Sequence, residues 1–417
     1  MDKNTTSAVK IEEARPQDLL ENLVREGARN AFQAALEEEV NQFLQRFSKF
    51  LDHKGHRMAV RNGYLPERAI LSGIGPLAIR QPRVDDRRLR KAEGGERFSS
   101  EILPRFMRRM PSIEGLIPVL YLKGISTGDF SEALAAILGD GAKGLSATTI
   151  TRLKEGWLEE HKRWSARSLE DKEYVYVWVD GIWVNVRLDE QRCCLLVMIG
   201  ATREGKKELI AVSDGYREST ASWREMLLDL KARGLKMAGK LAIGDGALGF
   251  WAAVEEVFPG VKHQRCWTHK TANVLDKFPR GVQSKAKRML HDRYQAETKE
   301  KARKAYALFI ASFKDKYPKA VECLQKDGDV LFTFYEFPAA HWIHIRTTNP
   351  IESTFATVRL RTAKTKGCGS RDATLSMVFK LCQEAEKSWR LLDGAKWIPL
   401  VLEGKRFVDG ELNEDAA

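Results

Sequence analysis

The sequence lacks any long hydrophobic run, and this absence argues against a membrane-spanning protein. None of its apolar stretches approaches the roughly 18 consecutive residues that a transmembrane helix requires. Residues 1–15 alternate charged and small polar side chains and contain no apolar segment of the kind found in a secretory signal. We therefore expect a protein that has no membrane partner and stays in the cytoplasm.

Cysteine is also scarce, and its six positions form no Cys-x2-Cys pair. The irregular spacing argues against a disulfide framework and favours reduced thiols in a reducing compartment. No Ser/His/Asp or Cys/His arrangement suited to nucleophilic catalysis is recognisable in the sequence. Chemistry that depends on a covalent protein intermediate is therefore not indicated.

Positive charge, by contrast, is abundant. The chain carries 69 Lys and Arg against 57 Asp and Glu, a net charge of +12, which favours polyanionic partners through counterion release. Residues 54–109 hold fourteen of the cations and only six of the acids, so two thirds of the excess lies in this segment. We interpret it as a phosphate-contacting surface of short strands and turns; the alternative is a solvated basic face.

At 417 residues the chain is too long for one hydrophobic core, and changes in periodicity indicate where it divides. Apolar residues recur with a helical period from Leu36 to Phe47, which predicts a packing stripe that two subunits can share. The expected organisation is a helical and dimerising region over 1–53, the basic strand and turn segment over 54–110, a helix-turn-helix-like region over 111–170, an α/β core over 171–269 and 345–400, a helical insertion over 270–344, and a frayed acidic tail over 401–417.

The region 111–170 has the order helix, turn, polar-faced helix. Its last predicted helix starts near Ser146, and the N-terminal end of that helix exposes Thr148, Thr149, Arg152 and Lys154. A helix-turn-helix protein places such a face against base edges in the major groove of DNA. The sequence therefore predicts DNA recognition here, with a purely structural helical hairpin as the alternative.

The middle of the chain changes to a pattern typical of strands. Three β-rich runs, at 174–186, 193–202 and 208–213, are separated by charged turns, and helix and strand then alternate as far as Arg265. Three antiparallel strands followed by alternating helices and strands is the order of a ribonuclease-H-like α/β domain. We expect this fold, interrupted by the helical insertion.

Three acids stand where they can bind metal. Asp180 interrupts an apolar run, Asp245 follows a short buried strand, and both precede glycine, which permits close approach of a cation or phosphate. Glu352 begins a helix. Each has an alternative, since Asp-Gly often forms a turn and Asn349, Pro350 and Glu352 satisfy a capping box. Together, three carboxylates suit two Mg²⁺ ions, or Mn²⁺ in their place, for phosphodiester chemistry.

The stretch that follows Glu352 is strongly basic and contains no acid from 353 to 371. An acid at the start of a basic helix suits a metal site beside a phosphodiester. We therefore expect contacts with the DNA backbone from four side chains, Arg359, Arg361, Lys364 and Lys366.

Four blocks of the sequence, YVWVDGIWV, IGDGALGFW, RCWTHK and TTNPIESTFATVRLRT, resemble bacterial mutator-type insertion-sequence transposases. The resemblance covers about residues 20–400 in the same order. It implies an Asp-Asp-Glu catalytic triad, carried by Asp180, Asp245 and Glu352, on a ribonuclease-H-like fold with an all-helical insertion before the glutamate. It also implies Mg²⁺-dependent cleavage and joining of DNA, with terminal inverted repeats and target DNA as partners. Because two ends must be brought together, we expect a homodimer or a larger assembly.

The family shares the pair Cys266 and His269, and His341 and His344 come after the helical sequence of the insertion, which ends near Pro338. Four such side chains can in principle bind zinc, but the spacing matches known zinc modules poorly. We favour a buried cysteine and a hydrogen-bonded histidine at the edge of the active site. Trp267, which lies between them, is typical of a core residue, although its position also suits contact with DNA.

The sequence thus favours a DNA transposase, associated with the nucleoid of a bacterial cell. Two alternatives stay open. One is a ribonuclease-H-like nuclease that cuts without joining, against which the insertion and the N-terminal DNA-reading region argue. The other is a catalytically silent DNA-binding protein descended from a transposase, against which the three intact acids argue.

Overall fold

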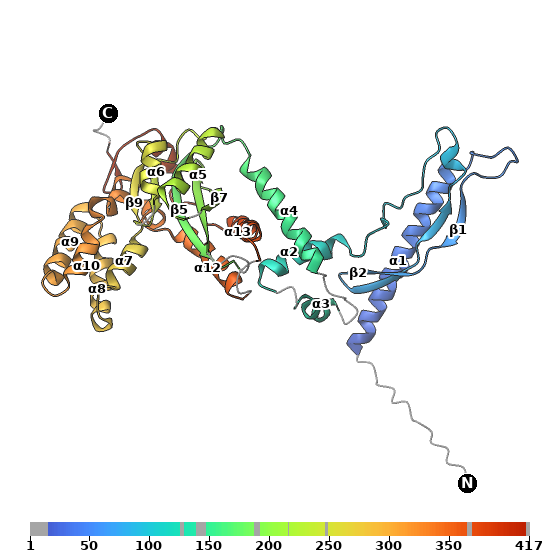
Figure 1. Ribbon diagram of the computed structural model, residues 1–417, viewed down its shortest axis with the longest axis horizontal. Coiled ribbons are helices and arrows are strands. Elements are labelled where there is room, and N and C mark those ends of the chain that lie inside the picture. Colours follow the sequence, from blue (N-terminus) through green and yellow to red (C-terminus); the bar gives the residue numbers. More distant parts are fainter. Residues whose placement is uncertain are drawn as a thin grey trace, which may run out of the picture. The chain divides into compact units, whose positions relative to one another are not determined.

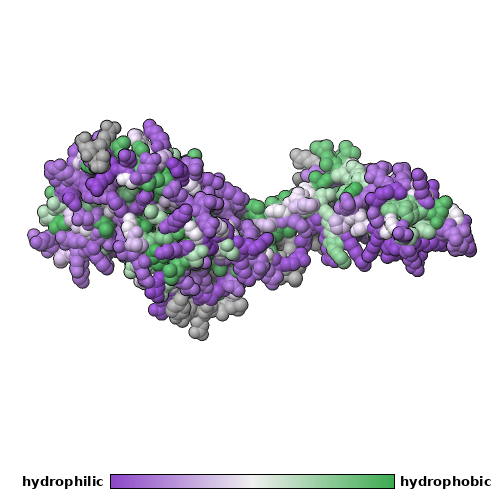
Figure 2. Space-filling view, turned by 90° about the horizontal axis from the view of Figure 1, so that it is seen from above, coloured by the Kyte–Doolittle hydropathy of each residue, from purple (hydrophilic) through white to green (hydrophobic). Residues whose placement is uncertain are grey.

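The computed structural model describes residues 16–125, 129–138, 147–186, 192–215, 217–246, 249–364 and 369–413. The chain divides into two compact units, Met1–Ile150 and Thr151–Ala417. Among the described helices, none is both long and apolar enough to cross a membrane. The face shown in Figure 2 is predominantly hydrophilic over both units.

The first unit is built on one long helix and two pairs of short strands (Figure 1). The helix is α1 (Pro16–Arg46). Strand β1 (Val60–Tyr64) pairs antiparallel with β4 (Pro82–Asp85), and β2 (Arg68–Ser72) pairs antiparallel with β3 (Gly75–Ile79). Short strands therefore account for the basic segment, as its glycines and prolines predict.

The apolar stripe of α1 packs against these strands. Leu36 is buried in a cluster with Ile70 and Leu77, while Phe43 and Phe47 belong to a second cluster farther along the helix. The stripe is therefore covered within the chain. Dimerisation through the region 1–53 stays a prediction.

Three helices follow, namely α2 (Pro111–Leu122), α3 (Phe130–Leu138) and α4 (Ala147–Ser165). Proline at the first position of α2 loses no hydrogen bond, because that N–H has no partner within a helix. The cap near Ser146 and the loop 139–144 lie outside the described residues. The helix-turn-helix assignment of this region stays a prediction.

The second unit contains a five-stranded mixed sheet in the order β7-β6-β5-β8-β9. Strands β5 (Tyr174–Val184), β6 (Cys193–Thr202) and β7 (Lys207–Gly215) are antiparallel neighbours. Strands β8 (Leu241–Gly244) and β9 (Lys262–Arg265) run parallel to β5. The prediction of three antiparallel strands followed by alternating helix and strand is confirmed at the level of a mixed α/β fold.

Helices cover both faces of this sheet. On one face, α5 (Thr220–Ala232) and α6 (Phe250–Val257) form a buried cluster with Val177 and Val179 of β5. Alternate side chains of a strand point to opposite faces, so Asp180 faces away from these helices.

The opposite face carries α12 (Asn349–Lys364), which contacts β5, and α13 (Arg371–Glu386), which contacts β7. The indole of Trp178 also points this way and donates a hydrogen bond of 3.0 Å to the main-chain oxygen of His344. The sheet therefore directs Asp180 toward the helix that begins near Glu352.

The segment between β9 and α12 is built from helices, drawn in yellow and orange in Figure 1. These are α7 (Trp267–Leu275), α8 (Arg280–Tyr294), α9 (Lys299–Phe313), α10 (Pro318–Gln325) and, after several single turns, α11 (Trp342–Ile345). Their helical character agrees with the sequence prediction.

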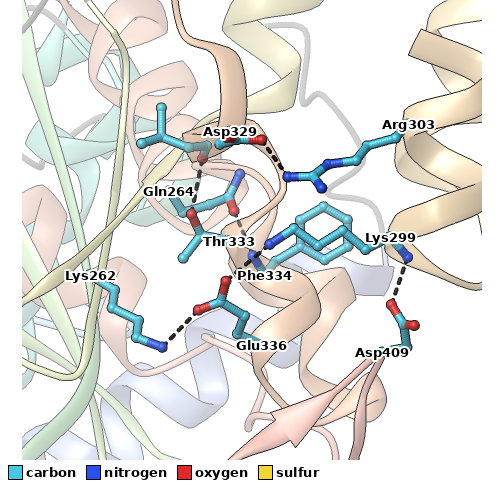
Figure 3. A network of polar contacts seen from close by, with 10 residues as sticks. Lys262, Gln264, Lys299, Arg303, Asp329, Thr333, Phe334, Glu336 and Asp409 are labelled. Atoms are coloured by element: carbon cyan, nitrogen blue, oxygen red, sulfur yellow. Dashed lines mark hydrogen bonds and ion pairs between the residues drawn. The ribbon is translucent and has the colours of Figure 1, made fainter. Parts of the chain in front are cut away.

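Figure 3 shows hydrogen bonds and ion pairs that connect this segment to β9 at the edge of the sheet. Glu336 pairs with Lys262 of β9 at 2.7 Å and with Lys299 of α9 at 3.0 Å. The main-chain N–H of Lys299 donates to Asp409 at 2.6 Å. Gln264 of β9 accepts the N–H of Phe334 at 2.8 Å.

Asp409 belongs to a hairpin formed by β10 (Phe407–Val408) and β11 (Glu411–Leu412), which follows α14 (Ile398–Leu402). Phe407 is only 4% exposed. The expectation of a frayed tail from 401 is therefore wrong as far as Asn413, because an apolar side chain and a carboxylate anchor the hairpin.

Candidate active site and nucleic-acid interface

Asp180 lies on β5, and Asp245 directly follows the neighbouring parallel strand β8. The register pairs Trp178 of β5 with Ile243 of β8, and the same offset of 65 residues sets Asp180 beside Asp245. Asp180 is not part of a turn, since β5 continues through it to Val184. The turn alternative is therefore wrong for Asp180.

Asp180 is a buried acid that other charged side chains influence. Burial, together with the negative charges of Glu218 and Asp245, raises the pKa of Asp180 to about 7, although His269 and the N–H of Gly181 oppose the shift. That N–H donates to Asp180 at 2.8 Å. Several carboxylates in a poorly hydrated place repel one another, so a bound cation would relieve this repulsion.

The third acid is held by a threonine. Helix α12 begins at Asn349, so Thr348 occupies the N-cap position. Its hydroxyl donates a hydrogen bond of 2.8 Å to Glu352 Oε1. The predicted capping box with Asn349 as the cap is therefore not formed, because Glu352 is the fourth residue of the helix, and Glu352 is oriented by the side chain of Thr348 instead.

His269 links the three acids. Its Nε2 lies 3.8 Å from Glu352 Oε1. The hydrogen bond with Cys266 raises the pKa of His269 to about 9, and the negative charges of Asp180 and Asp245 contribute to the shift. Glu352 therefore lies beside His269, and the charges of Asp180 and Asp245 act on the same imidazole.

Cys266 and Trp267 lie at the start of α7. Cys266 is 1% exposed, and its sulfur accepts the N–H of Thr348 at 3.3 Å and lies 3.9 Å from Glu352 Oε1. Trp267 is fully buried, and its indole donates to the main-chain oxygen of Leu331 at 2.8 Å. Contact of Trp267 with DNA is therefore excluded by its burial.

His341 and His344 do not join Cys266 and His269. The ring of His341 is held by the hydroxyl of Tyr176 at 2.7 Å and by the main-chain oxygen of Gly394 at 3.0 Å. His344 accepts the N–H of Asp393 at 3.0 Å. The four-ligand zinc set is therefore wrong.

One acid at the site had no sequence signal. Glu218 follows β7 and accepts the indole N–H of Trp183 at 3.0 Å. A Cβ built on Gly181 would lie 2.2 Å from Glu218 Oε1, so the missing side chain of Gly181 lets this carboxylate approach β5. Burial raises the pKa of Glu218, and the charge of Asp245 raises it further. In the sequence Glu218 stands among small and polar residues, RESTAS, which do not indicate a site.

The basic residues predicted to follow Glu352 on one helix differ in exposure. Arg359 is exposed on α12, but Arg361 is only 2% exposed, so its guanidinium is not presented to a phosphate. The side chain of Lys364 and the whole of Lys366 lie outside the described residues. Arg371 belongs to α13 and pairs with Asp214 at 2.6 Å.

Helix α4 carries the predicted base-reading residues. Arg152 is exposed and Lys154 is half-buried, whereas the side chains of Thr148 and Thr149 are outside the described part of the chain. The structure therefore leaves Arg152 available to a ligand.

The basic segment of the first unit forms two hollows. One, of about 900 Å³, is lined by Arg57, Arg87, Arg88, Arg90 and Lys91. The other, of about 890 Å³, is lined by Arg68, Arg83, Arg90, Arg97 and Arg105. Guanidinium groups gathered on one surface suit the phosphates of a nucleic acid.

Comparisons with known proteins identify the family of the chain. A family model described as "Transposase, Mutator family" matches residues 1–391. The transposase for insertion sequence element IS6120 of Mycolicibacterium smegmatis is 54% identical over 299 residues, which cover 72% of this chain and 92% of that protein. The transposase for IST2 of Acidithiobacillus ferrooxidans is 50% identical over 286 residues, 67% of this chain and 94% of that protein.

Proposed function

The chain belongs to the Mutator family of transposases, and we propose that it binds the terminal inverted repeats of an insertion sequence and cleaves and joins DNA strands. The observation that carries the proposal is the register that sets Asp180 beside Asp245, together with Glu352, 3.8 Å from a histidine whose pKa the charges of both aspartates help to raise. We infer that the three acids act together, as metal-dependent phosphodiester chemistry requires.

We assign the core to the ribonuclease-H-like fold. The strand order β7-β6-β5-β8-β9, with three antiparallel strands and two parallel ones, supports the assignment. Ligands of open α/β sheets bind near the carboxyl ends of parallel strands. Asp245 follows such an end, and its neighbour Asp180 lies on the adjacent strand.

The donor set fits hard divalent cations. Asp180, Asp245 and Glu352 offer carboxylate oxygens, the ligands that Mg²⁺ and Mn²⁺ prefer. The raised pKa of Asp180 reflects its burial first and then the nearby charges of Glu218 and Asp245, which a cation would balance. When bound, two such ions activate an attacking hydroxyl or water and stabilise the leaving oxygen. The chain itself orients Glu352 through Thr348 and buries Asp180 away from bulk water.

We assign DNA binding to two kinds of surface. The arginine-lined hollows of the first unit and the exposed Arg359 of α12 suit the sequence-independent contacts with phosphates. Helix α4, with Arg152 exposed, suits base contacts in the terminal repeats. Joining two DNA ends requires both in one assembly, so we propose a homodimer or a larger oligomer.

The proposal is tested with Asp180→Asn, Asp245→Asn and Glu352→Gln, which remove charge and keep size. Each variant should lower Mg²⁺-dependent cleavage of terminal-repeat DNA by at least about 100-fold, since a metal site supplies several kcal/mol of charge stabilisation, and should still bind DNA. Glu256→Gln, at an exposed acid of α6, is the matched control.

If any one of these three variants folds and still cleaves DNA at a near-normal rate, the substituted residue is not part of the site. Cleavage by the unmodified protein without joining to a target strand would instead favour the nuclease alternative.

A further inference from the structure

Cys266, His269 and Glu352 present a sulfur, an imidazole nitrogen and a carboxylate oxygen to one point. The three ligand atoms lie within 4.8 Å of one another. Glu352 Oε1 is 3.9 Å from the sulfur and 3.8 Å from Nε2 of His269. Bond lengths of about 2.0–2.3 Å around tetrahedral zinc place ligand atoms roughly 3.3–3.8 Å apart. A small contraction would therefore close these side chains on such an ion.

The backbone fixes this arrangement. Cys266 is the N-cap of α7, and His269 lies three residues farther along, so both side chains are on the same side of the helix. The N–H of Cys266 donates to the main-chain oxygen of Gly244 at 2.9 Å. Glu352 comes from the start of α12. Two helix starts therefore supply the ligands.

One residue contacts all three of them. The Thr348 hydroxyl donates to Glu352 Oε1 at 2.8 Å and lies 3.2 Å from the Cys266 sulfur and 3.5 Å from Nδ1 of His269. The Thr348 N–H also donates to the sulfur. Hydrogen bonds of this kind orient metal ligands.

A cation can reach this point from solvent. The side chains of His269 and Glu352 are 31% and 29% exposed, whereas Cys266 closes the inner side. Three protein ligands leave a fourth position of a tetrahedral ion for water. A thiolate and an imidazole select Zn²⁺ over Mg²⁺, which prefers oxygen ligands alone.

We propose that Cys266, His269 and Glu352 form a second cation site, which prefers thiophilic divalent ions such as zinc, and that its occupation withdraws Glu352 from the Mg²⁺ site. The binding of zinc does not depend on the proposed function. Its inhibitory effect rests on that function, because only a catalytic Glu352 makes the withdrawal matter.

Cobalt(II) provides a direct test, since it replaces zinc and absorbs light. Titration of the reduced full-length protein should give a sulfur-to-cobalt charge-transfer band and tetrahedral d–d bands at one equivalent, and zinc should bleach both. Cys266→Ser should abolish the charge-transfer band. Thr348→Val should weaken binding by about 10–100-fold, as expected for loss of a supporting hydrogen bond.

The matched control is Cys323→Ser, which changes a half-buried cysteine on α10 and should keep both bands. If Cys266→Ser does not fold, His269→Gln with every cysteine intact must weaken cobalt binding instead. The site is refuted if the unmodified protein gives no charge-transfer band, if the band survives in folded Cys266→Ser, or if His269→Gln binds cobalt as tightly as the unmodified protein.

Cleavage assays with excess Mg²⁺ test the second half of the proposal. Zinc should inhibit the unmodified protein and Cys323→Ser equally, and should inhibit Cys266→Ser far less, relative to its own zinc-free rate. Unchanged cleavage at zinc concentrations that bleach the cobalt bands would overturn the inhibitory role. A protein that shows the bands but cleaves no DNA with any cation would keep the site and refute the proposed function.

Discussion

The indole Nε1 of Trp251 donates a hydrogen bond of 2.7 Å to the main-chain oxygen of Asp245. The guanidinium of Arg265 stacks on the same indole, 3.7 Å from the ring centroid, and pairs with Asp327 at 3.5 Å. Trp251 thus fixes the position of Asp245. Arg265, at the end of β9, and Asp327, in the helical segment, in turn hold Trp251 in place.

We predict that Trp251→Phe, which keeps an aromatic ring and removes the donor, lowers the free energy of unfolding by about 1–2 kcal/mol. It should lower DNA cleavage by about tenfold or more, because small displacements of a catalytic group slow the reaction. Denaturant unfolding and single-turnover cleavage measure the two effects. Cleavage equal to that of the unmodified protein would show that this hydrogen bond does not position Asp245.

Glu218→Gln should raise the Mg²⁺ concentration needed for half-maximal cleavage several-fold. The reason is that a fourth carboxylate beside Asp180 and Asp245 attracts the cation. The Mg²⁺ dependence of the cleavage rate measures this change. Glu225→Gln, at an exposed acid of α5, is the control. An unaltered Mg²⁺ dependence would limit Glu218 to its hydrogen bond with Trp183.

The buried His341 should make the fold sensitive to acid. Burial lowers the pKa of His341 to about 4, and the nearby His344 adds to the shift. Above pH 6.5 neither the folded nor the unfolded chain binds this proton. Between pH 6.5 and pH 4 only the unfolded chain binds it. The free energy of unfolding should therefore decrease as the pH is lowered through this range, by about 3 kcal/mol in total.

His341→Gln should therefore flatten the pH dependence of the unfolding free energy between pH 6.5 and pH 4, even if the variant is less stable at neutral pH. Denaturant titrations across this range provide the measurement, with the exposed His53→Gln as control. Parallel curves for His341→Gln and the unmodified protein would contradict the assignment.

Two arginines should affect DNA binding in different ways. Arg152→Ala should reduce the preference for terminal repeats over random DNA by about 1–3 kcal/mol, the contribution of a base contact. Arg359→Ala should weaken binding to all sequences alike and reduce the salt slope by about one. Binding isotherms at several salt concentrations separate the two effects. An Arg152→Ala variant with unchanged discrimination would remove α4 from base recognition.

The sequence was sufficient to predict the strands and to single out Asp180 and Asp245, because an acid that interrupts or directly follows an apolar run can be recognised locally. The burial of individual side chains was not predictable in this way. Arg361 is buried, Trp267 packs against Tyr294 and Phe332, and His341 bonds to Tyr176, 165 residues earlier.

Glu218 and Thr348 show a further limit. Neither stands in a periodic pattern, and their importance arises from what lies opposite: the missing side chain of Gly181 in one case, and the sulfur of Cys266 in the other. Such relations are set by tertiary packing, which a single sequence does not contain.

The hydrogen bond between Thr348 and Cys266 joins residues that are 82 apart in the chain. Closing a loop of that length carries an entropy penalty on the order of 4 kcal/mol, and contacts of high sequence separation form late. Asp180 and Asp245 can take their places as soon as the sheet assembles. Glu352 can do so only when the helical segment between β9 and α12 has folded and the start of α12 lies next to the end of β9. During synthesis, a chain that has not yet emerged beyond residue 352 therefore holds only two of the three acids, and under the proposed function it would lack a complete cleavage site.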